Sequence, residues 1–375
     1  MFEKLSYFQL QEYWWGIASL LGGILAFLMF VQGGQTLIFS AKNETEKSLM
    51  INSLGRKWKF TFTTLVTFGG TMFAAFPLFY ATSFGGAYWL WFLLLFCFII
   101  QAIAFEFRIK TGNFLGHKTY EMFLFINGCA GTILLGIIVG TFFTGSAFIR
   151  NEYNISSWQN PLKGIEALFN IFNISLGLSL FFLARILGAL YFINNIKDES
   201  LIPKIIKLLK YNSVFFLIFF IYFIIQLLLK EGFAYESKTG IVYLEKYKYL
   251  NNILQMPCLM ILLISGIIMV LTGIIISLLK SSTKGIWYSG SGTILTVFTL
   301  ILCTGLNNTC FYPSLINLQS SLTIQNASSS RFTLITMSYV SLFLPIVFAY
   351  IFYTWKLIDK NKIVADEIKT EEHVY

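Results

Sequence analysis

Nine long apolar stretches are the feature that most constrains how this chain can fold. Each has about twenty residues or more, which is the length that a helix needs to cross the roughly 30 Å hydrocarbon core of a bilayer. Continuous apolarity excludes the strands of a membrane barrel, which alternate over about ten residues. The sequence therefore predicts an all-α integral membrane protein with about nine transmembrane helices. The stretches are Trp14–Phe39, Trp58–Ala81, Ala87–Phe107, Met122–Thr144, Ile165–Ile193, Tyr211–Leu229, Ile253–Leu279, Ile286–Cys310 and Phe332–Leu357.

The charge content agrees with an exterior that faces lipid. Only 12% of the 375 residues are charged, whereas a soluble domain carries roughly 25% charged residues. Because the connecting loops are short, we predict a single polytopic membrane domain over residues 1–357 and a charged tail over residues 358–375. The net charge of +9 comes from basic residues between the apolar stretches. No nucleic-acid-binding signature accompanies that charge, so no nucleic-acid partner is expected.

Lysine and arginine residues are divided unequally between the two predicted sides of the membrane. Eight lie in the N-terminal segment and the loops on its side, and eighteen lie in the opposite loops and the tail. Because cytoplasmic loops carry the excess of positive charge, we predict a periplasmic N-terminus and a cytoplasmic C-terminus. Tryptophans near the predicted helix ends are interpreted as an aromatic belt at the headgroup level. These are Trp14, Trp15, Trp58, Trp89, Trp91, Trp287 and Trp355.

The sequence offers few residues for catalysis or cofactor binding. The two histidines, His117 and His373, lie in a predicted loop and in the tail, whereas a membrane haem usually needs an axial ligand at depth. No nucleophile elbow, phosphate-binding loop, zinc-protease motif or dinucleotide fingerprint occurs in a usable context. The residues therefore predict no haem or metal bound by this chain and no catalytic residue.

Polar side chains within the apolar stretches are the remaining candidates, because such groups are costly inside a membrane. Arg185 could pair with Glu166, pair with a carboxylate or haem propionate of a partner, or extend its charge to the membrane surface. Gln32 and Gln35 share one face near the inner end of the first stretch. They could bind neighbouring helices or hold water, but a glutamine cannot release a proton at neutral pH.

Pairs of glycines recur in or beside the apolar stretches. The pairs are Gly22–Gly23, Gly33–Gly34, Gly69–Gly70 and Gly85–Gly86. In membrane helices, small residues let neighbouring backbones approach closely. We therefore interpret these glycines as packing positions rather than as a phosphate-binding loop.

The residues alone leave two classes of membrane protein open. One is an accessory subunit of a larger complex. The other is a secondary transporter, in which Arg185, the glutamine pair and the interruption of the first helix would form a site at a broken helix.

Three blocks of sequence resemble subunit II of the cytochrome bd quinol oxidases, including the cyanide-insensitive branch. The first covers residues 43–88, with Trp58 and the run FAAFPLFY. The second is AFEFRIK, residues 104–110, and the third is SSLTIQNASSSRFTL, residues 320–334. The blocks keep the family's order, and the resemblance extends through essentially the whole chain.

The resemblance implies a haem-free subunit in the bacterial cytoplasmic membrane, folded as two four-helix bundles plus one peripheral helix. Its partner would be a larger subunit I that carries two b-type haems and one d-type haem, oxidises quinol and reduces oxygen to water. Small accessory subunits, membrane lipid and quinone are further expected partners. An assembly factor that leaves the finished enzyme is a third alternative.

The chain departs from the family pattern at acidic positions. Many members carry Asp-Gly-Phe-Asp near the inner end of the first helix, where this chain has Gln32-Gly33-Gly34-Gln35. Many place Asp after the tryptophan that opens the second helix, where Lys59 follows Trp58 here. Glu106 matches the family's acid after the third helix, and we interpret Glu106 and Arg108 as interfacial charges. A proton path would then depend on water, Glu106 and groups of the partner. The candidate proton-path or interface residues are Gln32, Gln35, Lys59, Glu106, Arg108 and Arg185.

Overall fold

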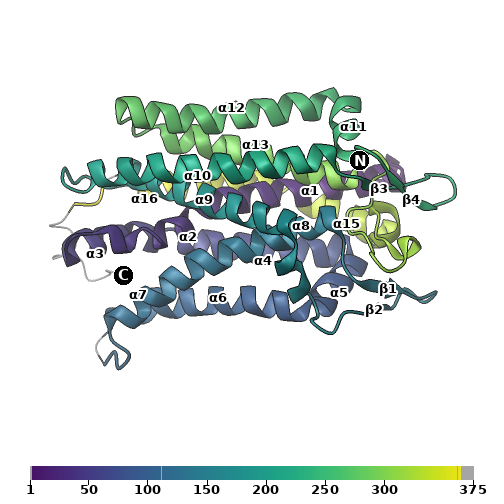
Figure 1. Cartoon of the computed structure of the whole chain (residues 1–375), viewed down its shortest axis with the longest axis horizontal. Helices are drawn as coiled ribbons and strands as arrows, with labels where there is room; N and C mark the ends of the chain where they lie inside the picture. Colours follow the sequence, from purple (N-terminus) through teal and green to yellow (C-terminus); the bar gives the residue numbers. More distant parts are fainter. Residues whose placement is uncertain (1, 111, 361, 365–375) are drawn as a thin grey trace.

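Long helices dominate the computed structural model, which describes residues 2–110, 112–360 and 362–364 (Figure 1). Eight helical segments of this part are long and apolar enough to span a membrane. The prediction of an all-α membrane protein is thus confirmed. The eight segments are Tyr7–Ser40, Tyr88–Phe107, His117–Thr144, Ile171–Asn195, Ile202–Leu229, Pro257–Lys280, Gly285–Gly305 and Arg331–Ile358.

The helices follow one another with short connections. In the first half they are α1 (Tyr7–Leu28), α2 (Phe30–Gln35), α3 (Glu44–Gly55), α4 (Trp58–Ala75), α5 (Pro77–Gly86), α6 (Tyr88–Phe107), α7 (His117–Ile126), the π-helix η3 (Asn127–Gly131) and α8 (Thr132–Thr144). In the second half they are α9 (Ile171–Asn195), α10 (Ile202–Leu229), α11 (Lys248–Gln255), α12 (Pro257–Lys280), α13 (Gly285–Gly305), α14 (Ile324–Ala327), α15 (Arg331–Ser341) and α16 (Leu344–Ile358). Short 3₁₀ helices are η1 (Phe2–Lys4), η2 (Ile38–Ser40), η4 (Ile165–Phe169) and η5 (Leu318–Ser320).

The second predicted span, Trp58–Ala81, is not among the eight segments. It is divided at Phe76, because Pro77 has no N–H group to donate and disfavours a helical residue before it. The first part, α4, nevertheless packs along α1, and its 18 residues form a helix about 27 Å long. The count of nine transmembrane helices therefore stays a prediction that depends on whether α4 spans the membrane. The arrangement in two four-helix bundles plus one peripheral helix also stays a prediction.

Several other spans differ from their predicted ends. The first is interrupted at Met29, where α1 passes into α2. The fifth begins at Ile171 rather than Ile165, because the Asn170 side chain caps α9 by accepting hydrogen bonds from its first turn. The sixth begins at Ile202, because the run IPKIIKLLK continues α10 beyond its apolar part.

Glycines let the central helix α9 meet its neighbours at close range. A Cβ on Gly33 of α2 would lie 1.9 Å from the Ala184 carbonyl oxygen of α9, and a Cβ on Gly136 of α8 would lie 2.6 Å from the Gly177 Cα. Such approaches are typical of membrane helix pairs. Gly70 of α4, by contrast, has no atom within 4 Å of its virtual Cβ. The predicted packing role is therefore confirmed for Gly33 and wrong for Gly70.

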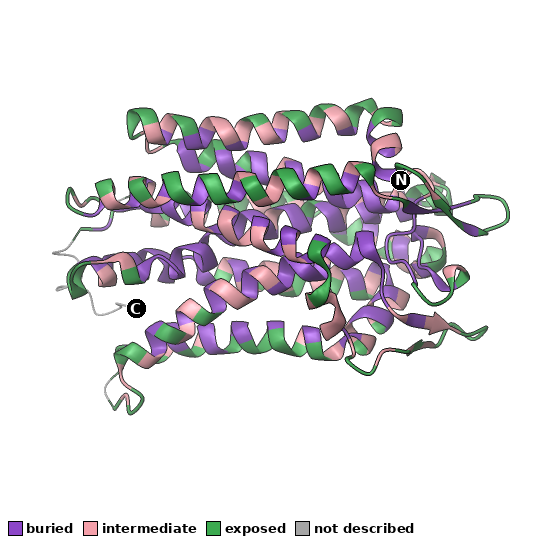
Figure 2. Ribbon diagram, in the orientation of Figure 1, coloured by how far each residue is buried: buried purple, intermediate pink, exposed green. Residues whose placement is uncertain are grey.

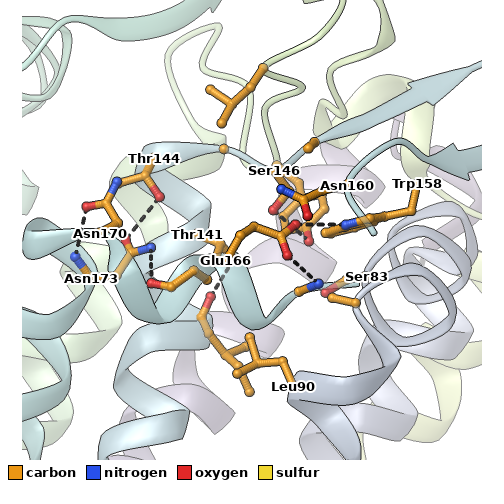
Figure 3. A pocket seen from close by; sticks show the side chains of 18 of the residues that line it. Ser83, Leu90, Thr141, Thr144, Ser146, Trp158, Asn160, Glu166, Asn170 and Asn173 are labelled. Atoms are coloured by element: carbon orange, nitrogen blue, oxygen red, sulfur yellow. Dashed lines mark hydrogen bonds between the residues drawn. The ribbon is translucent and has the colours of Figure 1, made fainter. Parts of the chain in front are cut away.

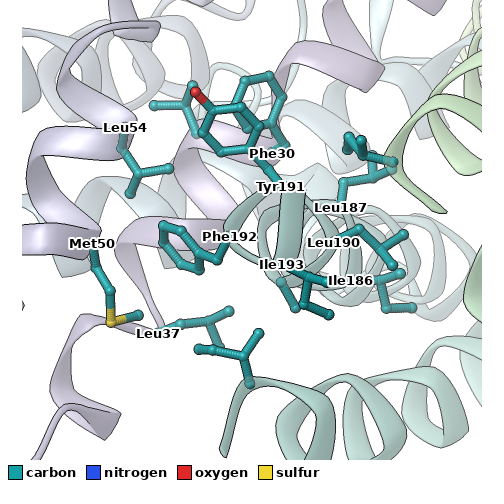
Figure 4. Close-up of a cluster of buried hydrophobic side chains, with 14 of the residues drawn as sticks. Phe30, Leu37, Met50, Leu54, Ile186, Leu187, Leu190, Tyr191, Phe192 and Ile193 are labelled. Carbon is teal, nitrogen blue, oxygen red and sulfur yellow. The ribbon is translucent and has the colours of Figure 1, made fainter. Parts of the chain in front are cut away.

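A dense apolar core lies where α2, α3 and α9 meet (Figure 4). The ring of Phe30 lies 4.4 Å from that of Tyr191, measured between centroids, and Leu54 and Phe192 are buried beside them. In Figure 2 the buried residues fill the centre of the bundle, and exposed residues mark the outward faces of α6, α10 and α12. Many of these exposed residues are large and apolar, as is expected for faces in contact with lipid.

Most of the tryptophans assigned to an aromatic belt face the interior instead. Trp58 stacks on Phe105 with the ring centroids 5.7 Å apart, and Trp14 Nε1 donates a hydrogen bond to Ser338 Oγ at 3.0 Å. The belt interpretation is therefore wrong for the buried set, which comprises Trp14, Trp15, Trp58 and Trp355. It stays a prediction for the exposed Trp89 and Trp287.

The two ends of the bundle differ in structure (Figure 1). At one, which we call the basic end, lie α3, the α6–α7 turn, the start of α10 and the end of α16. At the other, the hairpin end, two antiparallel hairpins pair β1 (Phe148–Arg150) with β2 (Ser156–Trp158) and β3 (Gly232–Tyr235) with β4 (Val242–Glu245). Strands of three or four residues are too short to be predicted from alternating polarity.

Candidate functional site

Four buried amide side chains gather inside the bundle, toward the basic end. We call Gln32, Gln35, Gln101 and Asn127 the amide cluster; they come from α2, α6 and η3. Gln32 Nε2 donates a hydrogen bond to Gln101 Oε1 at 3.1 Å. The π-helix η3 packs directly on α2, since a Cβ on Gly128 would lie 2.4 Å from the Gln32 carbonyl oxygen. The structure thus brings two predicted residues together with two that the sequence analysis did not select.

Most of the hydrogen-bonding atoms in the amide cluster have no partner among the described residues. These atoms are Gln32 Oε1, Gln35 Nε2 and Oε1, Gln101 Nε2, and Asn127 Nδ2 and Oδ1. A buried polar atom left unpaired costs about 1–3 kcal/mol, so such groups commonly bind ordered water. The amides can hold and orient water, but they cannot release a proton at neutral pH.

Arg185 of α9 is held by two neutral side chains. Its Nε donates to Asn212 Oδ1 at 2.7 Å, and its second guanidinium nitrogen, Nη1, donates to Thr36 Oγ1 at 2.7 Å. The Phe181 ring centroid lies 5.4 Å from the guanidinium carbon. Within the described part of the chain, no carboxylate oxygen lies within 4 Å of this arginine.

The pairing of Arg185 with Glu166 suggested by the sequence is wrong. Glu166 lies in η4 at the hairpin end, before α9 begins, and Arg185 lies about 21 Å along α9 from Ile171, its first residue. The Glu166 carboxylate instead accepts hydrogen bonds from Trp158 Nε1 and from the Gly164 backbone N–H, both at 2.8 Å. Its role here is to hold the loop between β2 and α9.

A cavity of about 150 Å³, lined by both polar and apolar residues, lies beside this loop at the hairpin end. Figure 3 shows Glu166 directed toward Trp158 on one side, and Thr144, Asn170 and Asn173 gathered on the other. Thr144 Oγ1 donates to Asn173 Oδ1 at 3.0 Å. The labelled polar wall carries one carboxylate among neutral groups, and the volume accommodates several water molecules. Its residues are dispersed over several elements, so no local sequence motif marks it.

The charged candidates at the basic end separate into buried and exposed residues. Arg108 is buried, and its terminal nitrogen Nη2 donates to Glu121 Oε1 at 3.0 Å, while Lys47 Nζ lies 3.1 Å from Glu121 Oε2. Lys59 Nζ lies 3.5 Å from Glu106 Oε1, but these side chains are 66% and 41% exposed. The interfacial role of Arg108 stays a prediction, although its side chain is buried within the chain; the buried carboxylate beside it is Glu121, which the sequence analysis missed.

A second buried ion pair closes the basic end. Lys57 Nζ lies 2.9 Å from Asp359 Oδ1 and 4.5 Å from the centre of the Trp355 ring. Burial lowers the pKa of the Lys57 ammonium, and the neighbouring Asp359 carboxylate offsets part of this effect. Asn195 Nδ2 also donates to Asp359 Oδ1 at 3.1 Å. The start of the predicted tail is therefore tied to the bundle; residues 365–375, which include His373, lie outside the described residues.

Comparison with known proteins identifies the family of this helical bundle. Residues 10–358 match the family described as cytochrome bd terminal oxidase subunit II. The chain belongs to the cytochrome bd oxidase subunit II family. This bd oxidase subunit is therefore a member of an oxidoreductase complex and a multi-pass membrane protein. Membership favours the oxidase interpretation over the secondary transporter.

Relatives of this bd oxidase subunit cover nearly its whole length. It is 24% identical over 385 aligned residues to "Cytochrome bd-I ubiquinol oxidase subunit 2" of Escherichia coli K12, covering 98% of this chain and 99% of that protein. It is 25% identical to "Probable cytochrome oxidase subunit 2" of Haemophilus influenzae, covering 86% and 88% of the two chains. A chain in the bd oxidase structure from Geobacillus thermodenitrificans aligns with a TM-score of 0.55 and 12% identity, over 94% of this chain and 96% of that chain. This last likeness supports the fold alone.

Proposed function

We propose that this chain is the haem-free subunit II of a bd-type quinol:oxygen oxidase in aerobic respiration. Its partner is a subunit I that carries two b-type haems and one d-type haem, oxidises quinol and reduces oxygen to water. The family match over residues 10–358 is the observation that carries this proposal. The placement of His117 supports it, because this side chain lies exposed at the start of α7 rather than at the depth of a membrane haem.

In this proposal the basic end faces the bacterial cytoplasm and the hairpin end faces the periplasm. Lysine and arginine residues concentrate in the segments of the basic end, and cytoplasmic loops carry such an excess. The N-terminus would then be periplasmic, and the segment after α16 would be cytoplasmic. Membrane lipid and quinone would surround the apolar faces, and small accessory subunits would pack on the same faces.

The amide cluster serves as a hydrated polar site rather than as a proton donor in this proposal. Its unpaired atoms favour bound water, and its glutamines replace the acids that many relatives carry. The Glu106 side chain is exposed, and its carboxylate lies beside Lys59 rather than beside the cluster. A proton path through this chain would therefore depend on bound water and on groups of the partner.

Affinity purification followed by difference absorption spectroscopy tests the proposal. The tagged chain should isolate a complex with the b-type and d-type haem spectra, and the chain purified without its partner should show none. Cells that lack the chain should lose quinol-dependent oxygen uptake by this complex. A haem spectrum from the isolated chain, or full oxidase turnover without it, would overturn the proposal. Absence of the chain from the active enzyme would identify it as an assembly factor instead.

A further inference from the structure

Arg185 carries a positive charge whose counter-ion does not come from the described part of the chain. Asn212 and Thr36 fix two of its three guanidinium nitrogens. The third nitrogen, Nη2, has no hydrogen-bond partner among the described residues, and Arg185 is only partly buried. The two neutral partners therefore hold the side chain in one orientation and leave the two N–H bonds of Nη2 without a partner among the described residues.

The position of Asn212 places the guanidinium at the edge of the hydrocarbon core. The apolar part of α10 begins at Tyr211 and ends at Leu229, a length of about 28 Å, which matches the roughly 30 Å of bilayer hydrocarbon. Asn212 is the second residue of this part, and its side chain holds Arg185 Nε. The guanidinium thus lies near the edge of the hydrocarbon core, on the side of the basic end.

The elements that hold Arg185 present a surface suited to lipid. Tyr211 and Phe215 on α10 and Phe39 beside α2 are exposed aromatic side chains. Lys207 and Lys210 are exposed in the last turns of α10 before the apolar part begins. Apolar and aromatic side chains followed by lysines at the membrane edge favour phospholipid with a negatively charged headgroup.

We propose that Arg185 binds the phosphate of an anionic phospholipid in the leaflet at the basic end. The unpaired guanidinium nitrogen Nη2 donates to phosphate oxygens in a charge-assisted hydrogen bond, and the acyl chains lie along the exposed apolar face of α10. Lys207 and Lys210 lie on the face of α10 away from Asn212, so they attract anionic lipid to this membrane edge rather than bind the same headgroup. A carboxylate of the partner subunit is the competing anion for Arg185. Such a carboxylate would not explain why exposed lysines lie at this membrane edge.

Native mass spectrometry of the intact complex in mild detergent tests this site. The wild-type complex should retain phosphatidylglycerol, and its occupancy should fall roughly fivefold or more in Arg185→Gln. Arg185→Lys, which keeps the charge and loses the planar guanidinium, should give an intermediate occupancy. Lys280→Gln is the matched control, because Lys280 is an exposed cation at the end of α12 on the same side of the bundle. The lipid occupancy of this variant should equal that of the wild-type complex.

A titration of the delipidated wild-type complex supplies a second measurement, which does not depend on the folding of a variant. Phosphatidylglycerol should bind in preference to phosphatidylcholine, and millimolar inorganic phosphate should not displace it. Displacement by inorganic phosphate would assign a free-anion site instead. Unchanged lipid occupancy in Arg185→Gln would overturn the proposal. Loss of the partner subunit from Arg185→Gln with lipid occupancy unchanged would also overturn it and would assign the counter-ion to that subunit.

Discussion

Lys57 Nζ lies 2.9 Å from Asp359 Oδ1, and this ion pair ties the start of α4 to the end of α16. The lysine side chain is fully buried, and the aspartate side chain is 12% exposed. Beyond the pair, the Ile363 backbone N–H donates to the Asn195 carbonyl at 3.0 Å, and Ile363 bridges to Ile196. The segment after the last helix therefore fixes that helix to the rest of the basic end.

We expect Lys57→Met to lower the stability of the chain by about 3–5 kcal/mol, because it leaves the Asp359 carboxylate in a buried site without its cation. Lys59→Met is the matched control, since Lys59 makes an exposed pair, and exposed pairs contribute about 0–1 kcal/mol. Thermal unfolding of the purified complex measures both variants. Lys57→Met with Asp359→Asn should recover part of the loss. Equal melting midpoints for the two single variants would show that the buried Lys57–Asp359 pair contributes no more to stability than the exposed Lys59–Glu106 pair.

Gly33→Ala should disrupt the contact between α2 and α9. The added Cβ would meet the Ala184 carbonyl oxygen at 1.9 Å, so one backbone must move away from the other. Gly70→Ala is the control within a second glycine pair, because its Cβ meets no atom within 4 Å. The control should be neutral or stabilising by up to about 1 kcal/mol through helix propensity. Yield of assembled complex and its melting midpoint compare the two; equal behaviour would argue against the close helix contact.

Glu121→Gln should damage the protein more than Glu106→Gln. The first change removes the charge of a buried carboxylate that faces both Arg108 and Lys47, at an expected cost of about 3–5 kcal/mol. The second change removes an exposed carboxylate, for which we expect less than a twofold change in oxygen uptake. Melting midpoints and quinol-dependent oxygen uptake should be measured together. A large loss of turnover in a stably folded Glu106→Gln complex would restore Glu106 to the proton path.

Acidification should loosen α3 from α10 through Glu46. Burial raises the pKa of Glu46, but hydrogen bonds from Lys204, the Lys42 backbone N–H and Ser200 outweigh it, so the pKa lies below its usual 4.5. A carboxyl with a lowered folded-state pKa contributes stability above pH 4.5, and this contribution is lost as the pH falls through the folded-state pKa.

Amide hydrogen exchange of α3 between pH 4 and 6, corrected for the intrinsic exchange rate, measures the effect. Protection should fall at the acid end in wild type, and Glu46→Gln should show weaker protection at pH 6 with a smaller pH dependence. Glu199→Gln, which alters an exposed carboxylate in the neighbouring loop, should behave as wild type. A pH response of the same size in Glu46→Gln would assign the effect to other groups.

The number and length of the apolar stretches were sufficient to predict the fold class, because a bilayer requires that apolar length in each spanning helix. The blocks around Trp58, Glu106 and Arg331 were sufficient to predict the family. Helix interruptions were harder to predict. Pro77 ends one helix and begins the next, whereas the break at Met29 has no proline or glycine at the site.

The direction in which each side chain points was decided by tertiary structure. In a stretch that is apolar on every face, periodicity does not distinguish the side toward protein from the side toward lipid. Trp58 and Trp355 were therefore assigned to the membrane surface but are buried, and Arg108 and Glu106, two residues apart, have opposite environments. The segments that enter the membrane could be predicted without the structure, since they depend on local composition. The partners of the chain's polar groups depend on contacts between distant segments, and only the folded chain decides those.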